Sequence, residues 1–437
     1  MEAMVFVFLV GYLAIALEHV LKVNKAAIAL LMAVIIWTLY GVIAPEEIEY
    51  QIASQMGEVC EVIAFLLGAM TIVELVDLHG GFALVSHIIK AQRKRSLLWI
   101  ITIITFFMSA VLDNMTSTII MIAITSKLLE DKTDKMWFAS AIVVAANGGG
   151  VWSPIGDVTT IMLWVNGNVT SGALIPHLIL PSLVSVMIPV VLISSCVKGP
   201  VCSCSYADDL DVGESLYPNV TRLDKMMIGI IGVGGLVSVP MFRAVTGLPP
   251  FMGVIAVLGL LWLLTEIIYD KHSNIMEGEQ LRIAKVLKKI DLPTIFFFFG
   301  ILMAVGALSE AGLLTMAADY LDAKIHNTYL ITGVIGILSA IVDNVPLVAA
   351  AMGMYPLADP ALVQAGTYAA QFMQDGVFWE LLAYCTGTGG SLLIIGSVSG
   401  VVAMGAENIG FGWYFKHITL KVFIGYVCGM LLYILIA

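Results

Sequence analysis

The chain has 437 residues, of which 60% are hydrophobic and only 12% charged, and its mean hydropathy is +0.98. Soluble domains carry about 25% charged residues, so this composition excludes an ordinary soluble protein and predicts an all-α polytopic membrane protein. The apolar runs are continuous rather than alternating, which argues against a β-barrel. The net charge of −11 argues against nucleic acid as a partner, and the expected surroundings are the lipid bilayer.

Three membrane spans are predicted first, over residues 6–21, 26–44 and 59–78, with an acidic loop between the second and the third. The N-terminus has neither a basic segment nor a small-residue cleavage site, so we expect the first span to be a retained helix. The third span carries Glu61 and Glu74. Both are candidates for proton access. Glu74 lies deeper in the span, whereas a solvated interfacial acid is the alternative for Glu61.

A predicted hairpin follows over about residues 97–130, with the stretch from Ser109 to Ser117 at its centre. Each arm is shorter than the roughly 20 residues that a span needs. Because both ends are basic, we expect the hairpin to enter and leave on one side of the membrane. Asp113 and Asn114 lie at its tip. A carboxylate at membrane depth costs about 2.5–3.5 kcal/mol, which favours a functional role, and helix capping is the alternative.

The next predicted element is a broken helix over about residues 136–165. Gly149, Gly150 and Pro154 interrupt its apolar run, and Asp157 and Thr159 follow the interruption. A further span at residues 173–197 completes the first half of the chain. Residues 198–225 are polar and are predicted to connect the two halves on the cytoplasmic side.

The second half, residues 226–437, repeats this order. Spans are predicted at 226–242, 250–269 and 293–308, and a hairpin at about 328–357 carries the related stretch Ser339-Ala-Ile-Val-Asp343-Asn344. A broken helix at about 377–404 contains Gly389 and Gly390, and a last span covers 413–436.

The basic residues predict the orientation of the chain. If the turn from Lys22 to Lys25 is cytoplasmic, all of the 21 Lys and Arg residues except Arg243 and Lys324 fall on the cytoplasmic side. Both termini then lie outside, and the two hairpins open to opposite sides. Residues 1–197 and 226–437 are therefore predicted to be inverted repeats, an arrangement typical of secondary transporters. This topology places no Lys or Arg at the midplane.

The chemistry expected at the breaks is that of a small-cation site. A desolvated hard cation needs oxygen ligands and a compensating negative charge. Backbone carbonyls are expected at Gly149, Gly150, Gly389 and Gly390, because non-helical backbone at membrane depth lines protein sites or water cavities. The candidate side chains are Ser109, Asp113, Asn114, Thr116, Asp157 and Thr159 around the first break, and Ser339, Asp343, Asn344, Thr388 and Ser391 around the second.

We expect Na+ to bind at Asp113, Asn114 and Asp157, with the two carboxylates alternating between cation and proton. Such competition arises because desolvation favours a protonated carboxyl and a nearby cation favours the charged one. Asp343 is either a third titrating group or is held by Asn344 and the facing half. The sequence contains no P-loop, dinucleotide-binding fingerprint or His-Glu-x-x-His motif, so we expect neither an enzyme nor a pump, and no cofactor.

These motifs resemble those of the NhaD-type sodium/proton antiporters, in the superfamily that includes arsenite permeases and sodium/dicarboxylate carriers. The resemblance spans essentially the whole chain and rests on residues 65–74, 113–117, 148–159 and 339–344. It implies exchange of cytoplasmic Na+ or Li+ for external H+, a scaffold plus a moving transport domain, and a homodimer. The absence of a transit segment favours a bacterial inner membrane over an organelle envelope.

Two alternative functions remain open. In the dicarboxylate branch of the superfamily the hairpin tips read Ser-Asn-Thr, whereas Asp113 and Asp343 stand at the Ser positions here. The additional negative charge disfavours an anionic substrate, yet a sodium-coupled or uncoupled permease for an anion or oxyacid remains the main alternative. A channel-like or sensory membrane protein is the other, since broken helices can also line a pore.

Overall fold

The computed structural model describes all residues except 17, 47, 81–88, 90, 202–221, 272–281, 365 and 437. In this described part of the chain every regular element is a helix, apart from one isolated bridge between Arg93 and Pro200. Seven of the described helices are long and apolar enough to cross a membrane. The prediction of an all-α polytopic membrane protein is confirmed.

The N-terminal region contains α1 (Glu2–Ala16), α2 (Glu18–Leu21), α3 (Lys25–Ile43) and α4 (Ile48–Leu78). The first predicted span is helical at all of its described residues, and α1 and α2 are separated by residue 17, which lies outside the described part. The expected acidic loop before the third span is wrong, because α4 is 31 residues long and begins at Ile48. Pro45 lies in a turn, and no proline follows within α4 to interrupt the helix.

The first predicted hairpin corresponds to two helices, and the first predicted broken helix to two more; re-entry of the hairpin on one side of the membrane stays a prediction. Their bounds are α6 (Lys94–Ser109), α7 (Asn114–Leu128), α8 (Lys132–Gly150), α9 (Val158–Val165) and α10 (Ser171–Ser194). The interruption covers residues 151–157. Gly149 and Gly150 thus end α8 as helical residues and do not lie within the break itself.

The second half has the same order of elements. It begins with α11 (Arg222–Thr246), and most of the predicted connection at 198–225 lies outside the described residues. Residues 313–324, between the predicted span at 293–308 and the predicted hairpin, form a further helix. The bounds are α12 (Pro250–Lys271), α13 (Ile283–Val286), η2 (Leu287–Lys289), α14 (Leu292–Glu310), α15 (Leu313–Lys324), α16 (Thr328–Leu338), α17 (Asn344–Met354), η3 (Tyr368–Phe372), α18 (Val377–Gly389), α19 (Val398–Glu407), α20 (Phe411–Tyr414), η4 (Phe415–Thr419) and α21 (Leu420–Ile436).

Each hairpin packs its first arm on the first part of a broken helix, α6 on α8 and α16 on α18. The contact is the same in both halves. Ser109 Oγ donates to Ala146 O at 2.6 Å, and Ser339 Oγ donates to Thr386 O at 2.8 Å. Gly149 faces the carbonyl of Phe106, and Gly389 faces that of Gly336, each too closely for a Cβ atom. Both hairpins are therefore held by direct backbone contact.

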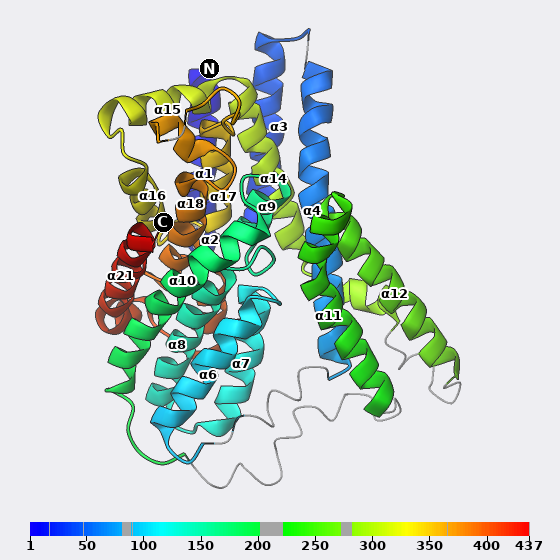
Figure 1. Ribbon diagram of the computed structural model, residues 1–437, viewed down its shortest axis with the longest axis vertical. Coiled ribbons are helices and arrows are strands. Elements are labelled where there is room, and N and C mark those ends of the chain that lie inside the picture. The colour runs from blue at the N-terminus through cyan, green and yellow to red at the C-terminus, as the bar shows by residue number, and fades with distance from the viewer. Residues whose placement is uncertain are drawn as a thin grey trace.

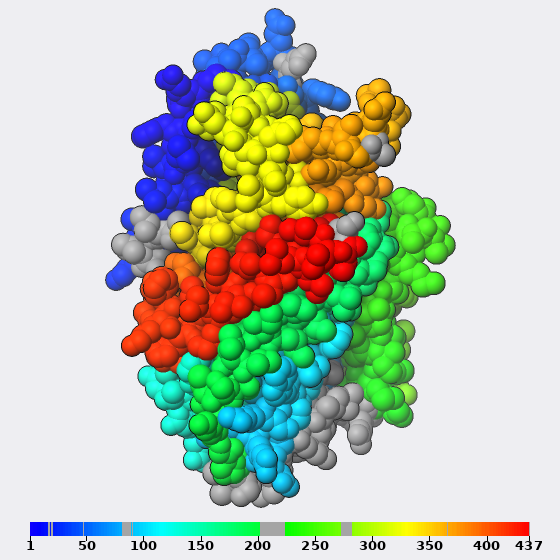
Figure 2. All heavy atoms as spheres, turned by 60° about the vertical axis from the view of Figure 1, so that its left-hand side comes forward, coloured from blue at the N-terminus to red at the C-terminus, as the bar shows by residue number. Residues whose placement is uncertain are grey.

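The arrangement of these pairs is visible in Figure 1, where α6 and α7 lie in the lower part of the molecule and α16 and α17 in the upper part. Helices α11 and α12 pack on α4 and lean away from the hairpins. Figure 2 shows α10 and α21 side by side across one face, between the two hairpin regions. This packing brings the tips of both hairpins to the breaks.

Candidate functional site

Asp157 is the centre of the candidate site. Its side chain is buried, with the residue only 2% exposed, and it caps the N-terminus of α9. Thr159 donates to Asp157 Oδ1 through its backbone N–H at 3.0 Å and through its hydroxyl at 3.1 Å. A buried carboxylate is costly unless donors surround it. The break places Asp157 directly before a helix start, where free N–H groups supply such donors.

Two amides from different hairpins complete the surroundings of this carboxylate. Asn114 Nδ2 donates to Asp157 Oδ2 at 3.0 Å, and Asn344 Nδ2 lies 3.3 Å and 3.4 Å from the two carboxylate oxygens. Asn114 is the first residue of α7, and Asn344 is the first residue of α17. The structure thus brings together Asn114, Asp157, Thr159 and Asn344, four of the predicted site residues.

Asp113 lies beside this cluster and also caps a helix. Its Oδ1 accepts from the Thr116 N–H at 2.8 Å, and its Oδ2 accepts from the Thr116 hydroxyl at 2.7 Å. Its neighbour Asn114 bonds to Asp157, and the charges of both Asp343 and Asp113 act on Asp157. Among the described residues, neither Asp113 nor Asp157 forms an ion pair. Asp113 therefore caps helix α7 and also lies beside the candidate site.

Asp343 differs from its counterpart. Lys25 Nζ, at the start of α3, donates to Asp343 Oδ2 at 2.9 Å. Lys25, predicted from the sequence to lie in a turn, thus reaches the second hairpin tip. Pro346 stands where the first hairpin has Thr116, and proline offers neither an N–H nor a hydroxyl. Asp343 accordingly makes no capping hydrogen bond, and its carboxylate is held by Lys25.

Asn147 is a central residue that the sequence reasoning missed. It is fully buried in α8, and its Nδ2 donates to Ser391 Oγ at 2.8 Å and to Ser397 Oγ at 2.9 Å. Its Oδ1 accepts from Ser399 at 2.7 Å and from Asn114 at 3.1 Å. One amide thus ties both broken helices to the first hairpin. The available signal was an Asn next to three glycines inside an apolar run, because a buried amide must find partners.

The remaining predicted residues have mostly local roles in this structure. The hydroxyls of Ser109 and Ser339 bond to backbone carbonyls, and Thr388 Oγ1 donates to Tyr384 O at 2.5 Å. Ser391 reaches the cluster only through Asn147. The carbonyl of Gly389, expected to be free, accepts from the Leu392 N–H at 2.9 Å. That expectation is wrong because a tight turn follows α18.

Neither acid proposed for proton access lies at the Asp157 cluster. Glu74 is close to Asp77 and Lys289 near the end of α4, and Glu61 faces the charge of Arg243. Within the described residues, neither acid forms a hydrogen bond with a cluster residue. The role in proton access therefore stays a prediction for both.

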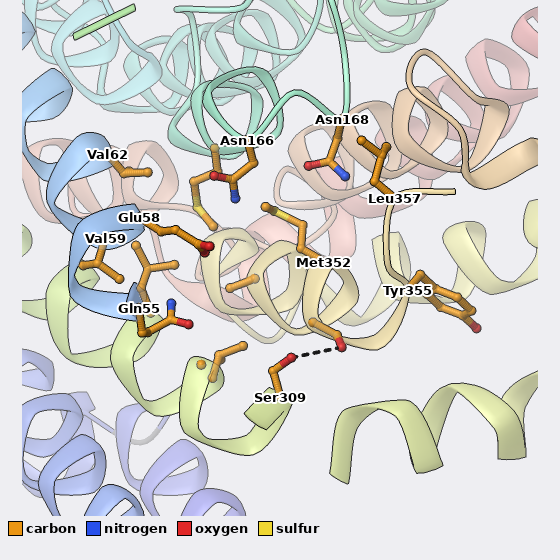
Figure 3. Close-up of a pocket in the computed structure, with 16 residues that line it drawn as sticks. Gln55, Glu58, Val59, Val62, Asn166, Asn168, Ser309, Met352, Tyr355 and Leu357 are labelled. Carbon is orange, nitrogen blue, oxygen red and sulfur yellow. Dashed lines mark hydrogen bonds between the residues drawn. The ribbon is translucent and has the colours of Figure 1, made fainter. Parts of the chain in front are cut away.

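A cavity of about 350 Å³ lies between α4, α9, α14 and α17. Figure 3 shows the carboxylate of Glu58 pointing into it, with Asn166 and Asn168 on the opposite wall. Glu58 is the one charged residue among those that line the cavity. Helix α9 runs from Asp157 to this cavity, and eight helical residues span about 12 Å. The cavity is thus one short helix away from the cluster.

A second cavity of about 210 Å³ lies at the other end of α17. Its charged lining residues are Glu18, Lys25 and Asp343, and Ser397 contributes a hydroxyl. Helix α17 therefore begins at this cavity and ends at the first one, with Asn344 on the Asp157 cluster.

Comparison of the sequence with known proteins places the chain in a family. The sequence profile of the family described as citrate transporter matches residues 12–373. "Sodium/proton antiporter 1" of Arabidopsis thaliana is 44% identical over 99% of this chain and 72% of its own. "Sodium/proton antiporter 2" of the same plant is 41% identical over 99% of this chain and 98% of its own. "Na(+)/H(+) antiporter NhaD" of Alkalimonas amylolytica is 29% identical over 97% of this chain and 88% of its own.

The resemblance found in the motifs is thereby confirmed over nearly the whole length. The residues that form the Asp157 cluster lie within the matched range of the family profile. The chain belongs to the citrate transporter family and, within it, to the NhaD-type sodium/proton antiporters.

Proposed function

We propose that this protein is a secondary antiporter that exchanges cytoplasmic Na+ or Li+ for external H+ by alternating access. The observation that carries the proposal is the buried Asp157 carboxylate, held by Asn114 and Asn344 from two hairpins. Asp113 supplies a second carboxylate beside it. The relatives are named as sodium/proton antiporters, which supports the same function.

Competition for one carboxylate couples the two ions. Desolvation disfavours a bare carboxylate, and either a proton or a bound cation relieves this cost. An Asn side chain presents either its N–H groups or its carbonyl oxygen after rotation of the amide. Asn114 and Asn344 donate to Asp157 in the structure, and the same residues ligate a cation through oxygen. Carboxylate and amide oxygens are the ligands that hard cations prefer.

The two halves of the chain are proposed to be inverted repeats with re-entrant hairpins. The support comes from equivalent contacts, in which Ser109 and Ser339 hold their hairpins to the broken helices in the same way. Discontinuous helices that meet at one site are typical of such transporters. A scaffold and a transport domain, a homodimer and external termini remain predictions, as does the cytoplasmic connection at 198–225.

The membrane in which the protein resides is also a prediction. Seven apolar helices support a multi-pass membrane protein. We propose the bacterial inner membrane, with an organelle envelope as the alternative. Imaging of a fluorescent fusion in the source cells, with membrane fractionation, distinguishes the two.

The two cavities are proposed to be the access routes to the site. They lie at opposite ends of α17, and Asn344, the first residue of that helix, bonds to Asp157. Glu58 in the larger cavity supplies the negative charge that would attract a cation or a proton toward α9.

Transport of citrate or another polyanion is the alternative function, because the family description names citrate. The cluster contains the Asp157 carboxylate, two amides and a threonine, with the Asp113 carboxylate beside it, and a polyanion would be repelled by the two carboxylates. Lys25 carries a positive charge near the second hairpin tip, but Asp343 neutralises it. The composition of the site therefore favours a cation.

Purified protein in liposomes with a pH dye inside tests the proposal. A proton gradient is imposed, and Na+, Li+, K+ and citrate are then added in turn. Wild type is expected to respond to Na+ and Li+, and Asp157→Asn is expected to give no response. Asp134→Asn is the matched control, because Asp134 pairs with Lys94 away from the cluster. Full exchange by Asp157→Asn would contradict the site, and citrate uptake without proton movement would support the alternative.

A further inference from the structure

Among the described residues, the ion pair between Lys25 and Asp343 has no counterpart at the equivalent residue of the first half. Lys25 Nζ lies 2.9 Å from Asp343 Oδ2, and their side chains are 21% and 14% exposed. The equivalent residue in the first hairpin is Asp113, whose two oxygens accept from Thr116. One of the two related carboxylates, Asp343, is therefore paired with an ammonium group from a distant part of the chain.

The surroundings of Lys25 are those of a cation site. Glu18 Oε1 accepts from the backbone N–H of Lys25 at 3.2 Å, and Asp291 is near enough to act on its charge. The ammonium also lies over the ring of Phe297, 4.3 Å from the centroid, which attracts a cation. Asp343 thus pairs with the ammonium group directly, and the charges of Glu18 and Asp291 act on it from farther away, so removal of the ammonium leaves an excess of negative charge.

Room for a replacement ion is present at the same place. The cavity of about 210 Å³ is lined by Lys25, Asp343, Glu18 and the hydroxyl-bearing residues Tyr12, Thr294 and Ser397. The volume of one liquid water is about 30 Å³, so the space accommodates a small cation together with several waters. These oxygen-bearing side chains are the type of ligand that Na+ takes.

We propose that Lys25 is a tethered cation that fills the second carboxylate site, so that the transported ion binds only on the Asp113 and Asp157 side. Lys25 is then a specificity-determining residue that sets how many cations one chain binds. This inference rests on the proposed sodium/proton exchange. It explains how two related hairpins produce a single transport site, since one of the two is already neutralised within the chain.

The test is the number of ²²Na+ ions bound per purified full-length chain at saturation. Lys25→Gln is expected to bind one Na+ more than wild type, and Lys25→Gln with Asp343→Asn is expected to return to the wild-type number. Lys25→Arg keeps the charge and is expected to match wild type. Lys94→Gln is the control, because the Lys94–Asp134 pair has nearly the same exposure, 21% and 15%, and its loss is expected to leave the number unchanged.

An unchanged number in folded Lys25→Gln overturns the inference, as does an additional ion that persists after Asp343→Asn. If Lys25→Gln does not fold, Lys25→Met keeps the apolar stem over Phe297 and is measured instead. Absence of Na+ binding and of exchange in wild type would contradict the proposed function. Binding in wild type with no increase in either Lys25 variant would contradict only the role of Lys25.

Discussion

The two hairpin tips have the same motif but different electrostatic surroundings. Asn114 and Asn344 are used alike, since both donate to Asp157. The aspartates before them are not, because Asp113 caps α7 and Asp343 pairs with Lys25. The difference begins with one position, where Thr116 in the first tip corresponds to Pro346 in the second. Loss of a capping partner leaves a carboxylate free for another part of the chain.

The largest effect on transport is expected from removing the negative charge of Asp113 at the first hairpin tip. Asp113→Asn removes a carboxylate beside the cation, and loss of one partner of a close charge pair costs about 2–5 kcal/mol. We therefore expect at least about a 30-fold fall in Na+-driven proton exchange, measured in liposomes. The double variant Lys25→Gln with Asp343→Asn removes the pair at the second tip and is expected to lose less than about tenfold. Equal losses in the two variants would mean that the tips are equivalent after all.

The next largest effect, on the free energy of unfolding, is expected at Asn147, which links the two broken helices. Asn147→Ala removes an amide that makes four hydrogen bonds and deprives the buried Ser391 hydroxyl of its donor, whereas Ser397 and Ser399 keep their bond to each other. The expected loss in free energy of unfolding is about 3 kcal/mol, because each unsatisfied buried group costs about 1–3 kcal/mol. Thermal unfolding in detergent measures it. A stability equal to wild type would show that the two broken helices are held together by other contacts.

The close backbone contacts are expected to be equally sensitive in both halves. A Cβ atom at Gly149 or Gly389 would collide with the carbonyl of the neighbouring hairpin arm. Each alanine variant is expected to lose about 1–3 kcal/mol of stability, as is usual for overpacking. Gly259→Ala is the matched control, because a Cβ there meets nothing within 4 Å, and alanine raises helix propensity. A tolerated Gly389→Ala alone would show that the second hairpin is packed more loosely.

The smallest effect on stability is expected at Ser109 and Ser339, the serines that hold the two hairpins to the broken helices. Ser109→Ala and Ser339→Ala each remove one hydrogen bond to a backbone carbonyl, which is worth about 1 kcal/mol. We expect equal losses of stability and an unchanged KM for Na+, since neither hydroxyl reaches Asp157 in the described structure. A KM raised by Ser109→Ala alone would instead place that hydroxyl among the cation ligands.

The sequence predicted what is local and missed what joins distant segments. Asp113 precedes Thr116 by three positions, and Asp157 precedes Thr159 by two. The capping of each aspartate by its own threonine therefore follows from the spacing. The pair of Lys25 and Asp343 joins residues 318 positions apart. Lys25 was assigned to a cytoplasmic turn because charge patterns report only the side of the membrane. Asn147 was overlooked because a run of glycines directs attention to the backbone and away from the amide beside it.

The placement of the two cavities has an electrical consequence. Helix α17 has 11 residues and reaches from one cavity to the other, a length of about 16 Å. The hydrocarbon core of a membrane is about 30 Å thick. If the two cavities are the water-filled access routes proposed above, most of the membrane voltage falls across the short segment between them, where one charge gains about 2.3 kcal/mol per 100 mV. Exchange that moves net charge would then be driven over that short distance instead of the full thickness of the membrane.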